Sequence, residues 1–296
     1  MVQQSSRPGR AHRARLDRVE TARSTRGIDY QDIPRPIAGL ADEYAPGFVD
    51  PFHSHKRAQL LYASAGVTSV TTHQASFVVP PQRAVWIPSG VAHEVHCRGH
   101  VSVRTLYVDP QARDDLPTTC QVLEISNLLR ELILEAVMLP VEYETAGRDG
   151  RVMELIFDEI MSAPVIALHV PMPQNPRLLR ICRLILDNPA HTDTLDDWAR
   201  VAGMGRRTFT RMFMRETQTT FAAWRQHVRL MEALSRLAGG HPVTTVALDV
   251  GYNSPSAFTA MFRRAFGVAP SKYLPMFPAW KLKQDQPAKQ SKDDSR

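Results

Sequence analysis

The sequence is poor in cysteine and has no long apolar run. Its three cysteines are odd in number and far apart, which argues against a disulfide framework and for a reducing compartment. No stretch approaches the roughly 18 apolar residues of a membrane-spanning helix. The opening MVQQSSRPGRAHRAR also lacks the apolar core of a secretory signal. We therefore expect a cytoplasmic protein without a membrane partner.

The excess of positive charge is small, but it is unevenly distributed. The 296 residues carry a formal net charge of +6, which divides into +5 over residues 1–27, −8 over 28–175, +7 over 176–280 and +2 over 281–296. An acidic middle followed by a basic third is expected when one domain contacts polyanions and another does not. The alternative is that charge varies by chance from one solvent-exposed surface to another. The apolar fraction of 43% suffices for a buried core, and the length allows two domains.

The C-terminal third contains one pattern twice. LDDWARVAGMGRRTFTRMF (195–213) aligns with VTTVALDVGYNSPSAFTAMF (243–262) at an offset of 48 residues, which becomes 49 after Asn253. In each copy a short helix is predicted to end at Gly203 or Gly251, because glycine readily takes the left-handed conformation of a tight turn. A second helix follows, with apolar residues at i, i+3 and i+4. The pattern predicts two helix-turn-helix motifs.

Residues that favour helix ends bound these predicted helices. Thr194 and Ser254 are good N-caps, and Pro242 suits the first helical position in the second copy. Between the copies, FAAWRQHVRLMEALSRLA (221–238) predicts a long amphipathic helix that stops at Gly239. At 1.5 Å per residue this helix is roughly 27 Å long. That length is compatible with holding two recognition helices in successive major grooves, about 34 Å apart.

The outward face of each second helix carries side chains that can read DNA. Arg can bond guanine bidentately or pair with phosphate, Asn reads adenine, and Thr or Ser can bond a base or touch the thymine methyl group. A solvated cationic face on an ordinary helix pair is the alternative, but two copies with matching faces favour DNA. The predicted DNA-binding residues are Arg206, Arg207, Thr210, Arg211 and Arg215 in the first copy, and Asn253, Ser256, Thr259, Arg263 and Arg264 in the second.

Over about residues 176–274 the sequence resembles the AraC/XylS-type transcriptional regulators. The resemblance is carried by WARVAGMGRRTFTRMF, the linking helix, and GYNSPSAFTAMFRRAFGVAPSKY, in that order. It implies a unit of two helix-turn-helix motifs that binds DNA through both recognition helices. By position, the family's base-facing residues correspond to Arg207, Thr210 and Arg211 in the first helix and to Ser256, Thr259 and Ala260 in the second.

Two positions depart from that family pattern. Ala260 stands where many members have a longer polar side chain, so the second helix is expected to rely on Arg263, Arg264 and phosphate. Leu274 stands where an Arg often follows the closing Tyr, which removes one phosphate contact.

The middle of the chain is predicted to be a sandwich or a small β barrel. Residues 28–110 alternate β-prone runs with Gly or Pro breaks: QLLYASAG, VTSVTTH, SFVVPP, AVWIPSG, HEVHCRG and VSVRTLYVD. Helical patterns follow at about Cys120–Met138 and Gly150–Met161, before a Pro-rich joint, PMPQNP. One face of the second of these helices carries Val152, Leu155, Ile156 and Ile160, and we expect it to bury against the barrel or a second subunit.

Histidines of the middle region resemble the two cupin motifs. HSH (53–55) is similar to H-x-H, and PSGVAH (88–93) is similar to P-x-G-x-x-H. In metal-binding cupins these motifs bring three His and one Glu to one metal, and here the Glu position is most nearly met by Gln59, a neutral and poorer ligand. Three imidazoles can still bind Zn²⁺ or a similar ion. The alternative is that these side chains line a metal-free pocket for a small molecule, or cap strands.

We predict an effector pocket lined by His53, His55, Gln59, Trp86 and His93. We predict no cofactor, with a divalent metal at His53, His55 and His93 as the open alternative. A second cluster, His93, His96, Cys97 and His100, has metal-ligand side chains, but strand alternation would direct His93 and His96 to opposite faces.

Taken together, the sequence predicts an α+β protein of two domains, a small cupin-like β barrel and an all-α domain with two helix-turn-helix motifs joined by a long helix. The predicted boundaries are a disordered basic tail at 1–27, a sensor domain with its following helices at 28–170, a linker at 171–176, a DNA-binding domain at 177–280 and a disordered tail at 281–296. The whole arrangement resembles the cupin-headed branch of the AraC family, including its nitroimidazole-resistance regulator subgroup.

The predicted function is that of a sequence-specific transcriptional regulator, either a repressor or an activator, whose barrel responds to a small-molecule effector. A metal-responsive regulator that uses the barrel histidines is the alternative. A cupin metalloenzyme is disfavoured by Gln59 and by the lack of an evident acid/base pair, so no enzymatic activity is expected. The expected partners are double-stranded DNA and the effector, with RNA polymerase and a second copy of the chain as further candidates.

Overall fold

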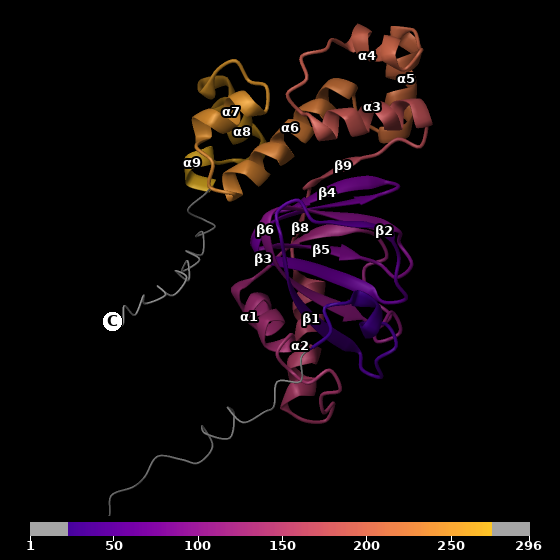
Figure 1. Cartoon of the computed structure of the whole chain (residues 1–296), viewed down its shortest axis with the longest axis vertical. Coiled ribbons are helices and arrows are strands. Elements are labelled where there is room, and N and C mark those ends of the chain that lie inside the picture. Colours follow the sequence, from indigo (N-terminus) through magenta and orange to yellow (C-terminus); the bar gives the residue numbers. More distant parts are fainter. Residues whose placement is uncertain (1–22, 274–296) are drawn as a thin grey trace, which may run out of the picture.

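The computed structural model describes residues 23–273, in which a β domain carries a helical domain at one end (Figure 1). The predicted tail at 281–296, most of the tail at 1–27, and Leu274 lie outside the described residues. Residues 23–27 lie beside the β domain, where the Arg23 guanidinium donates to the Val137 carbonyl. No helix within residues 23–273 is long and apolar enough to cross a membrane.

The β domain is one curved, antiparallel, nine-stranded sheet, which confirms the β domain predicted from the sequence. Its main path runs β1-β6-β3-β5-β7-β8, while β2 pairs with β6, and β4 pairs with β3 and β9. A short 3₁₀ helix, Gly27–Tyr30, precedes the sheet. The strands are β1 (Ile37–Tyr44), β2 (Val49–His53), β3 (Ala58–Thr72), β4 (Ala75–Val79), β5 (Arg83–Ile87), β6 (His93–Val108), β7 (Gln121–Glu124), β8 (Val165–Ile166) and β9 (His169–Pro171).

Two strands are longer than the sequence predicts. QLLYASAG and VTSVTT form the single strand β3, and HEVHCRG and VSVRTLYV form the single strand β6. The glycines taken as strand breaks instead lie in continuous strands that bend. The β3–β6 register shifts between Ala63 and Ala65 and again between Ala65 and Val67, an interval that contains Gly66, whose φ is +80°. A Cβ at Gly66 would lie 2.2 Å from the His100 carbonyl oxygen, so this bend brings two backbones into close contact.

Helices α1 (Asn127–Ala136) and α2 (Arg148–Ser162) cover one face of the sheet. The predicted helix at Cys120–Met138 is wrong over its first turns, because β7 forms there and pairs with β5. Its backbone groups are satisfied by that ladder. The helix begins only after Ser126, whose side chain accepts a hydrogen bond of 2.9 Å from the Leu129 amide.

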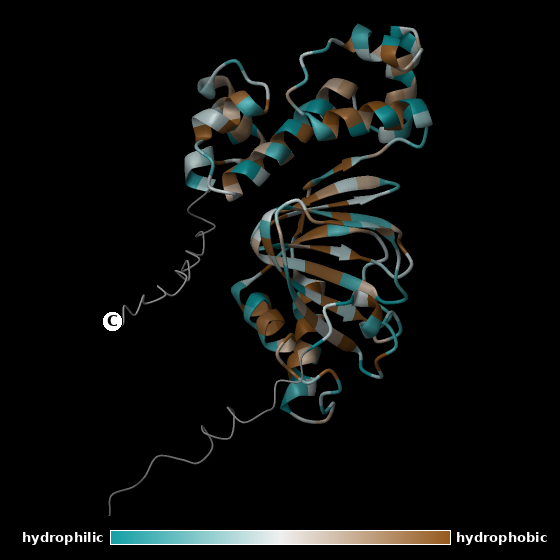
Figure 2. Cartoon of the chain, viewed as in Figure 1, coloured by the Kyte–Doolittle hydropathy of each residue, from teal (hydrophilic) through white to brown (hydrophobic). Residues whose placement is uncertain are grey.

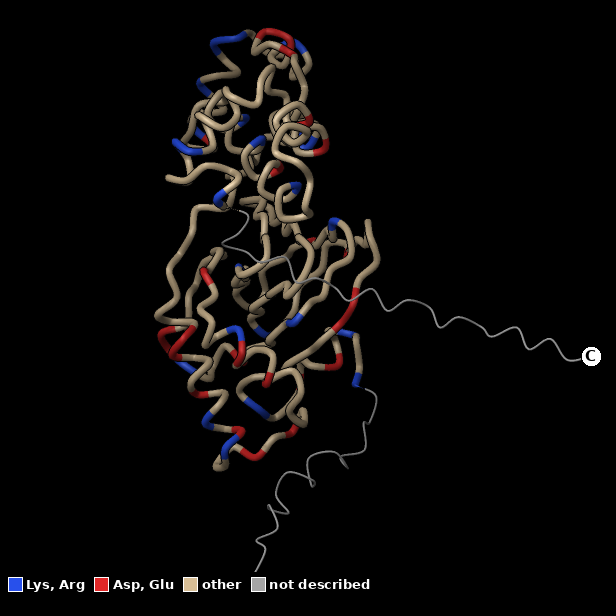
Figure 3. The backbone as a smooth tube through the Cα atoms, turned by 90° about the vertical axis from the view of Figure 1, so that its left-hand side faces the viewer, with Lys and Arg blue, Asp and Glu red and all other residues tan. Residues whose placement is uncertain are grey.

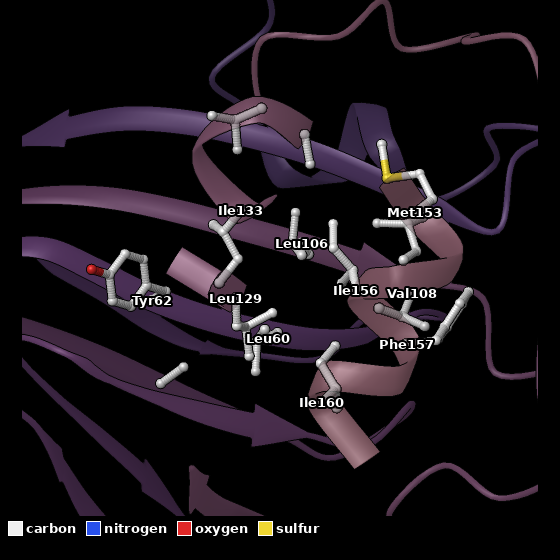
Figure 4. Close-up of a cluster of buried hydrophobic side chains, with 14 of the residues drawn as sticks. Leu60, Tyr62, Leu106, Val108, Leu129, Ile133, Met153, Ile156, Phe157 and Ile160 are labelled. Carbon is white, nitrogen blue, oxygen red and sulfur yellow. The ribbon is translucent and has the colours of Figure 1, made fainter. Parts of the chain in front are cut away.

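A large apolar cluster joins these helices to the sheet (Figure 4). Leu60 and Leu106 meet Ile156 and Phe157 there, all of them 1% exposed or less. Of the apolar face predicted for α2, Ile156 and Ile160 pack inward, whereas Leu155 is 39% exposed.

The helical domain consists of two helix-turn-helix units on one long helix. Its helices are α3 (Pro176–Asp187), α4 (Leu195–Val201), α5 (Arg206–Thr217), α6 (Phe221–Ala238), α7 (Val243–Asp249), α8 (Pro255–Phe266) and α9 (Pro270–Tyr273). Thr194 forms a capping box with Asp197, and Ser254 caps α8, as predicted. The turn glycines Gly203 and Gly251 have φ of +64° and +83°. Pro242 lies one position earlier than predicted, as the N-cap of α7.

Each unit has its own hydrophobic core, and the two cores use different halves of α6. Trp224 and Val228 of α6 pack with α3, α4 and α5. Leu234 and Leu237 of α6 pack with α7 and α8. Both clusters continue into the sheet, so the brown apolar positions in Figure 2 run from the strands through α6 into both units. The β domain and the two units therefore form one packed body along α6.

Polar contacts reinforce this junction. The Trp224 indole donates to the Pro171 carbonyl at 2.7 Å, and Nε2 of His227 lies 3.2 Å from the Ala167 carbonyl. Arg98 of β6 forms an ion pair with Glu232 of α6.

Candidate DNA-binding surface and effector cavity

The recognition helix of the first unit, α5, presents its cations to solvent. Arg206, Arg207, Arg211 and Arg215 are exposed, while Thr210 is half-buried and donates its hydroxyl to the carbonyl oxygens of Arg206 and Arg207, at 3.1 and 3.2 Å. An exposed guanidinium keeps its donors available for a base edge or a phosphate.

The corresponding helix of the second unit, α8, presents a similar face. Asn253, Ser256, Arg263 and Arg264 are exposed, and Thr259 is half-buried. Ala260 is also exposed on this helix. The two faces are thus alike in type, but the second places its Arg pair nearer to the C-terminal end of the helix.

The helical domain has an excess of positive charge. Residues 176–273 contain 14 Lys and Arg against 7 Asp and Glu (Figure 3). Several of the acidic side chains pair within the domain: Asp196 with Arg206 at 2.9 Å, Asp197 with Arg200 at 3.0 Å, and Asp249 with Arg236 at 2.7 Å. Because the domain has more basic than acidic side chains, cations remain after these pairs have formed, and these cations are available to bind a polyanion.

The β domain contains a cavity of about 460 Å³ between the sheet and residues 25–31. Its wall has polar groups from several strands and apolar side chains behind them. The polar part of the lining includes Tyr44, His53, His55, Gln59, Thr105 and Tyr107. Gly27 closes over Tyr107, since a Cβ there would lie 2.4 Å from the Tyr107 hydroxyl.

The three predicted histidines lie close together, but of the three only His53 and His55 line this cavity, and the prediction that His93 lines it is wrong. The ring centroids of His53 and His93 are 4.5 Å apart, those of His55 and His93 are 4.9 Å apart, and one nitrogen from each of the three rings lies within 4.8 Å of the others. Nδ1 of His53 lies 2.7 Å from the Pro51 carbonyl, and Nδ1 of His93 lies 2.9 Å from the Val91 carbonyl. A carbonyl can only accept, so in each of these two rings Nδ1 carries a proton, and in the neutral ring Nε2 carries the lone pair.

Buried acceptors without partners mark this cluster. Among the described residues, Nε2 of His55, Nε2 of His93 and Oε1 of Gln59 have no hydrogen-bond partner. Burial, followed by the neighbouring His93 and His53, lowers the pKa of His55 to about 4. Burial also lowers the pKa of His93. His55 and His93 are therefore neutral near pH 7, and the Nε2 atom of each has no hydrogen-bond partner among the described residues.

The structure does not bring Trp86 to this cavity. Trp86 lies opposite Leu60 in the β3–β5 ladder and packs with it against the helices, where its indole donates to the Pro117 carbonyl at 2.8 Å. Gln59, one position away along β3, lines the cavity because successive side chains of a strand point to opposite faces. The second cluster also separates as expected: His93 is buried and His96 is exposed.

Comparison with known proteins assigns both domains. Residues 198–276 match the model of a helix-turn-helix domain, and residues 37–158 match that of the AraC-like ligand binding domain. The chain is 34% identical over 224 residues to the HTH-type transcriptional regulator NimR of Escherichia coli K12, covering 76% of this chain and 82% of that protein. The chain belongs to the AraC family of transcriptional regulators.

Other matches are more local or more distant. RipA of Corynebacterium glutamicum, an HTH-type transcriptional regulator, is 32% identical over 103 residues, which cover 35% of this chain and 31% of RipA. The crystal structure of ToxT from Vibrio cholerae with a bound unsaturated fatty acid is 13% identical, covers 81% of this chain and 96% of ToxT, and has a TM-score of 0.36.

Sequence reasoning missed several groups around the cavity of this AraC-family protein. Tyr44, Thr105 and Tyr107 line it, but nothing in a lone aromatic or Thr of a strand indicates a cavity. Arg57 was missed as well. It is 5% exposed and donates to the carbonyls of Gln31, Ile33 and Arg35, which holds the segment before β1 against the sheet.

Proposed function

We propose that this AraC-family protein regulates transcription by binding two adjacent half-sites on double-stranded DNA with α5 and α8, and that a small molecule in the barrel cavity changes this binding. It acts in the cytoplasm, as a regulator and not as a cupin metalloenzyme. The exposed cations of both recognition helices support the first part. The second part rests on how the cavity is connected to α6.

One observation carries the effector proposal. Leu61 and Val95 line the cavity, and both belong to the buried cluster that contains Leu230 and Leu234 of α6 and Phe258 of α8. The wall of the cavity is therefore part of the same close-packed core as the second helix-turn-helix unit. Packed cores transmit small displacements because they have few voids to absorb them. A ligand that moves this wall would shift the balance between arrangements of α6 and α8.

The lining indicates the chemistry of the effector. Hydroxyl groups of Thr105 and Tyr107 and the unpaired Oε1 of Gln59 offer hydrogen bonds, while Leu61 and Val95 offer an apolar surface. A small neutral molecule with both a polar edge and an apolar body fits this wall.

The test uses the full chain and a duplex that it selects from a random-sequence pool. A compound library is screened by thermal shift, and the DNA dissociation constant is then measured by anisotropy with and without each stabilising compound. We expect compounds that stabilise the wild type to change its DNA affinity. Tyr107→Phe should weaken the binding of these compounds to the protein without altering DNA binding in their absence. Compounds that bind at the cavity but leave DNA affinity unchanged would refute the coupling.

A metal-responsive regulator is the second candidate, and the unpaired imidazole nitrogens favour it. His53, His55 and His93 would hold a Zn²⁺ ion through nitrogen atoms that already lie within 4.8 Å of one another, and Gln59 would supply an amide oxygen. Neutral imidazoles are the form that binds metal, and the carbonyls on two Nδ1 atoms fix the ring orientations. The ion would act as an effector that draws β2 and β6 together.

Metal binding is tested by calorimetry of the chelator-treated full chain with Zn²⁺, followed by DNA anisotropy. We expect one ion per chain, loss of binding in His55→Ala, and tighter binding in Gln59→Glu because a carboxylate is the better ligand. His100→Ala, an exposed histidine outside the cluster, is the matched control. An absence of stoichiometric uptake would remove this candidate and leave the small-molecule proposal standing. RNA polymerase and a second copy of the chain stay predictions of the sequence.

A further inference from the structure

The two helix-turn-helix units meet at the middle of α6. The buried α6 residues in the core of the first unit extend as far as Met231, and those in the core of the second begin at Leu230. The two units therefore have separate apolar cores on one helix, and each core also packs against the sheet. Their relative orientation decides whether both recognition helices fit the same DNA face, since successive major grooves present one fixed angle and spacing.

Arg229 lies at this boundary and bonds to both units. Its Nε donates to the Pro189 carbonyl at 3.0 Å and its Nη2 to the His191 carbonyl at 3.0 Å, both in the loop that leads into α4. Its Nη1 donates to the Gly251 carbonyl at 3.3 Å, in the turn between α7 and α8. One rigid, planar guanidinium thus joins the entry of the first unit to the turn of the second.

The turn of the second unit is shaped around this side chain. A Cβ at Gly251 would lie 3.0 Å from Nη2 of Arg229 and 3.2 Å from the Cα of Ala190. The guanidinium also lies 6.0 Å from the ring centroid of Tyr252, within cation–π distance. Two features therefore favour glycine at 251, namely its positive φ and the close approach of the Arg229 guanidinium.

The neighbouring Arg225 is a comparable arginine of α6 whose hydrogen bonds go to one unit only. It lies one turn earlier on α6 and donates to the Asp193 and His191 carbonyls, at 2.8 and 2.6 Å. Both acceptors belong to the loop of the first unit. Arg225 and Arg229 thus share residue type, helix and chemistry, but Arg229 also bonds to the second unit, through the Gly251 carbonyl.

We infer that Arg229 is a positioning residue that fixes the relative orientation of α5 and α8, and thereby the spacing between half-sites that the protein accepts. This inference rests on the DNA-binding function proposed above. Within residues 23–273 the hydrogen-bond acceptors of Arg229 are backbone carbonyls of both units. Three of its five N–H donors are thus engaged in holding the two units.

The test compares spacing variants of one duplex. The wild-type full chain selects a duplex from a random pool, and one base pair is then inserted or removed between the two protected half-sites. Each such change rotates one half-site by about one tenth of a helical turn relative to the other. Dissociation constants are measured for the selected duplex, both spacing variants and each half-site alone.

For Arg229→Met we expect affinity for the selected spacing to fall on the order of tenfold, because the two units no longer bind as one preorganised pair. Affinity for each isolated half-site should be unchanged, and the preference for the selected spacing should shrink. Arg225→Met is the matched control and should keep the wild-type preference. Arg229→Lys keeps the charge but can reach fewer carbonyls, so its affinity for the selected duplex and its spacing preference should lie between those of the wild type and Arg229→Met. The same variant replaces Arg229→Met in the test if the Met variant unfolds.

Three outcomes would overturn the inference. If Arg229→Met keeps the wild-type spacing preference, the hydrogen bonds of Arg229 do not set the relative orientation of α5 and α8. A uniform loss on every duplex, including single half-sites, with a salt slope lowered by about 1, makes Arg229 a phosphate contact instead. An Arg225→Met variant that behaves like Arg229→Met assigns the effect to the first unit alone. Failure of the wild type to select any duplex refutes the proposed function itself.

Discussion

Arg98 and Glu232 form an ion pair that joins the β domain to the linking helix. Arg98 lies on β6 and is partly exposed, whereas the Glu232 side chain is only 8% exposed and also accepts from Arg236 at 2.8 Å. Arg236 in turn pairs with Asp249 of α7. Alternating charges therefore run from the barrel across α6 to the second helix-turn-helix unit. A cavity of about 290 Å³ lies beside this pair, between the sheet and helices α3 and α6.

Removing Arg98 should weaken the contact between the domains. Arg98→Met leaves the nearly buried Glu232 with Arg236 as its cation, and we expect a loss of about 1–2 kcal/mol in the free energy of unfolding. Urea unfolding and a double-mutant cycle with Glu232→Gln measure the coupling. Arg148→Met, which breaks exposed ion pairs on α2, is the control and should have no measurable effect. A zero coupling energy would show that Arg98 and Glu232 stabilise the fold independently.

Arg57 should be essential to the segment that covers the cavity. Arg57→Met removes the donors that the carbonyls of residues 31–36 share, so we expect a loss of about 2–4 kcal/mol in stability. Amide exchange of residues 24–36 should become faster. The adjacent Lys56→Met breaks only an exposed ion pair with Asp32 and should leave both measurements unchanged. Equal effects of the two variants would contradict the role given to Arg57.

The two bend glycines should differ sharply in their tolerance of a methyl group. Gly66 and Gly99 have similar φ values, +80° and +71°. A Cβ at Gly66 would overlap the His100 carbonyl, whereas at Gly99 it meets nothing within 4 Å. Gly99→Ala should therefore cost about 1 kcal/mol, the strain of the left-handed conformation alone. Gly66→Ala should cost at least about 3 kcal/mol, because strain and overlap add. Chemical denaturation of the full chain measures both.

Arg211 should read one base. Arg211→Ala is expected to lose about 1–3 kcal/mol of discrimination at one position of the selected duplex, if its exposed guanidinium bonds guanine O6 and N7. Anisotropy on duplexes substituted one base pair at a time measures this loss. Arg200→Ala on α4, outside the recognition faces, should keep the full pattern of discrimination. An equal drop on all duplexes would identify Arg211 as a phosphate contact.

The linking helix and the two helix-turn-helix units could be predicted closely because their signals are local, whereas α3 and α9 were not predicted. Phe221–Ala238 is helical from the first to the last predicted residue, and caps such as Thr194 act within one turn. The β domain was harder because strand ends depend on partners far along the chain. Gly66 looks like a break in sequence, yet pairing with β6 carries the strand through it. Likewise, Val122 and Leu123 suit either a helix or a strand, and the β5 ladder decides.

The effector cavity could be predicted only in part. Spacing in HSH and PSGVAH brought the three histidines together correctly, because each motif fixes its own strand end. Trp86 failed to join them because one step along β5 reverses the direction of a side chain. The contacts between barrel and α6, such as Trp224 with Pro171, depend on the docking of two domains and leave no periodic signal in sequence.

The acceptors of Arg229 have a consequence for how new specificities can arise. Pro189, His191 and Gly251 accept its hydrogen bonds through main-chain oxygens, which do not depend on the side chains at 189 and 191, whereas position 251 needs glycine for its turn. The alignment of the two units is thus insulated from the side chains that read bases. Substitutions on the outward faces of α5 and α8 can therefore accumulate without changing the bonds that Arg229 makes. A duplicated gene can thus acquire a new operator while the relative orientation of its two helix-turn-helix units stays the same.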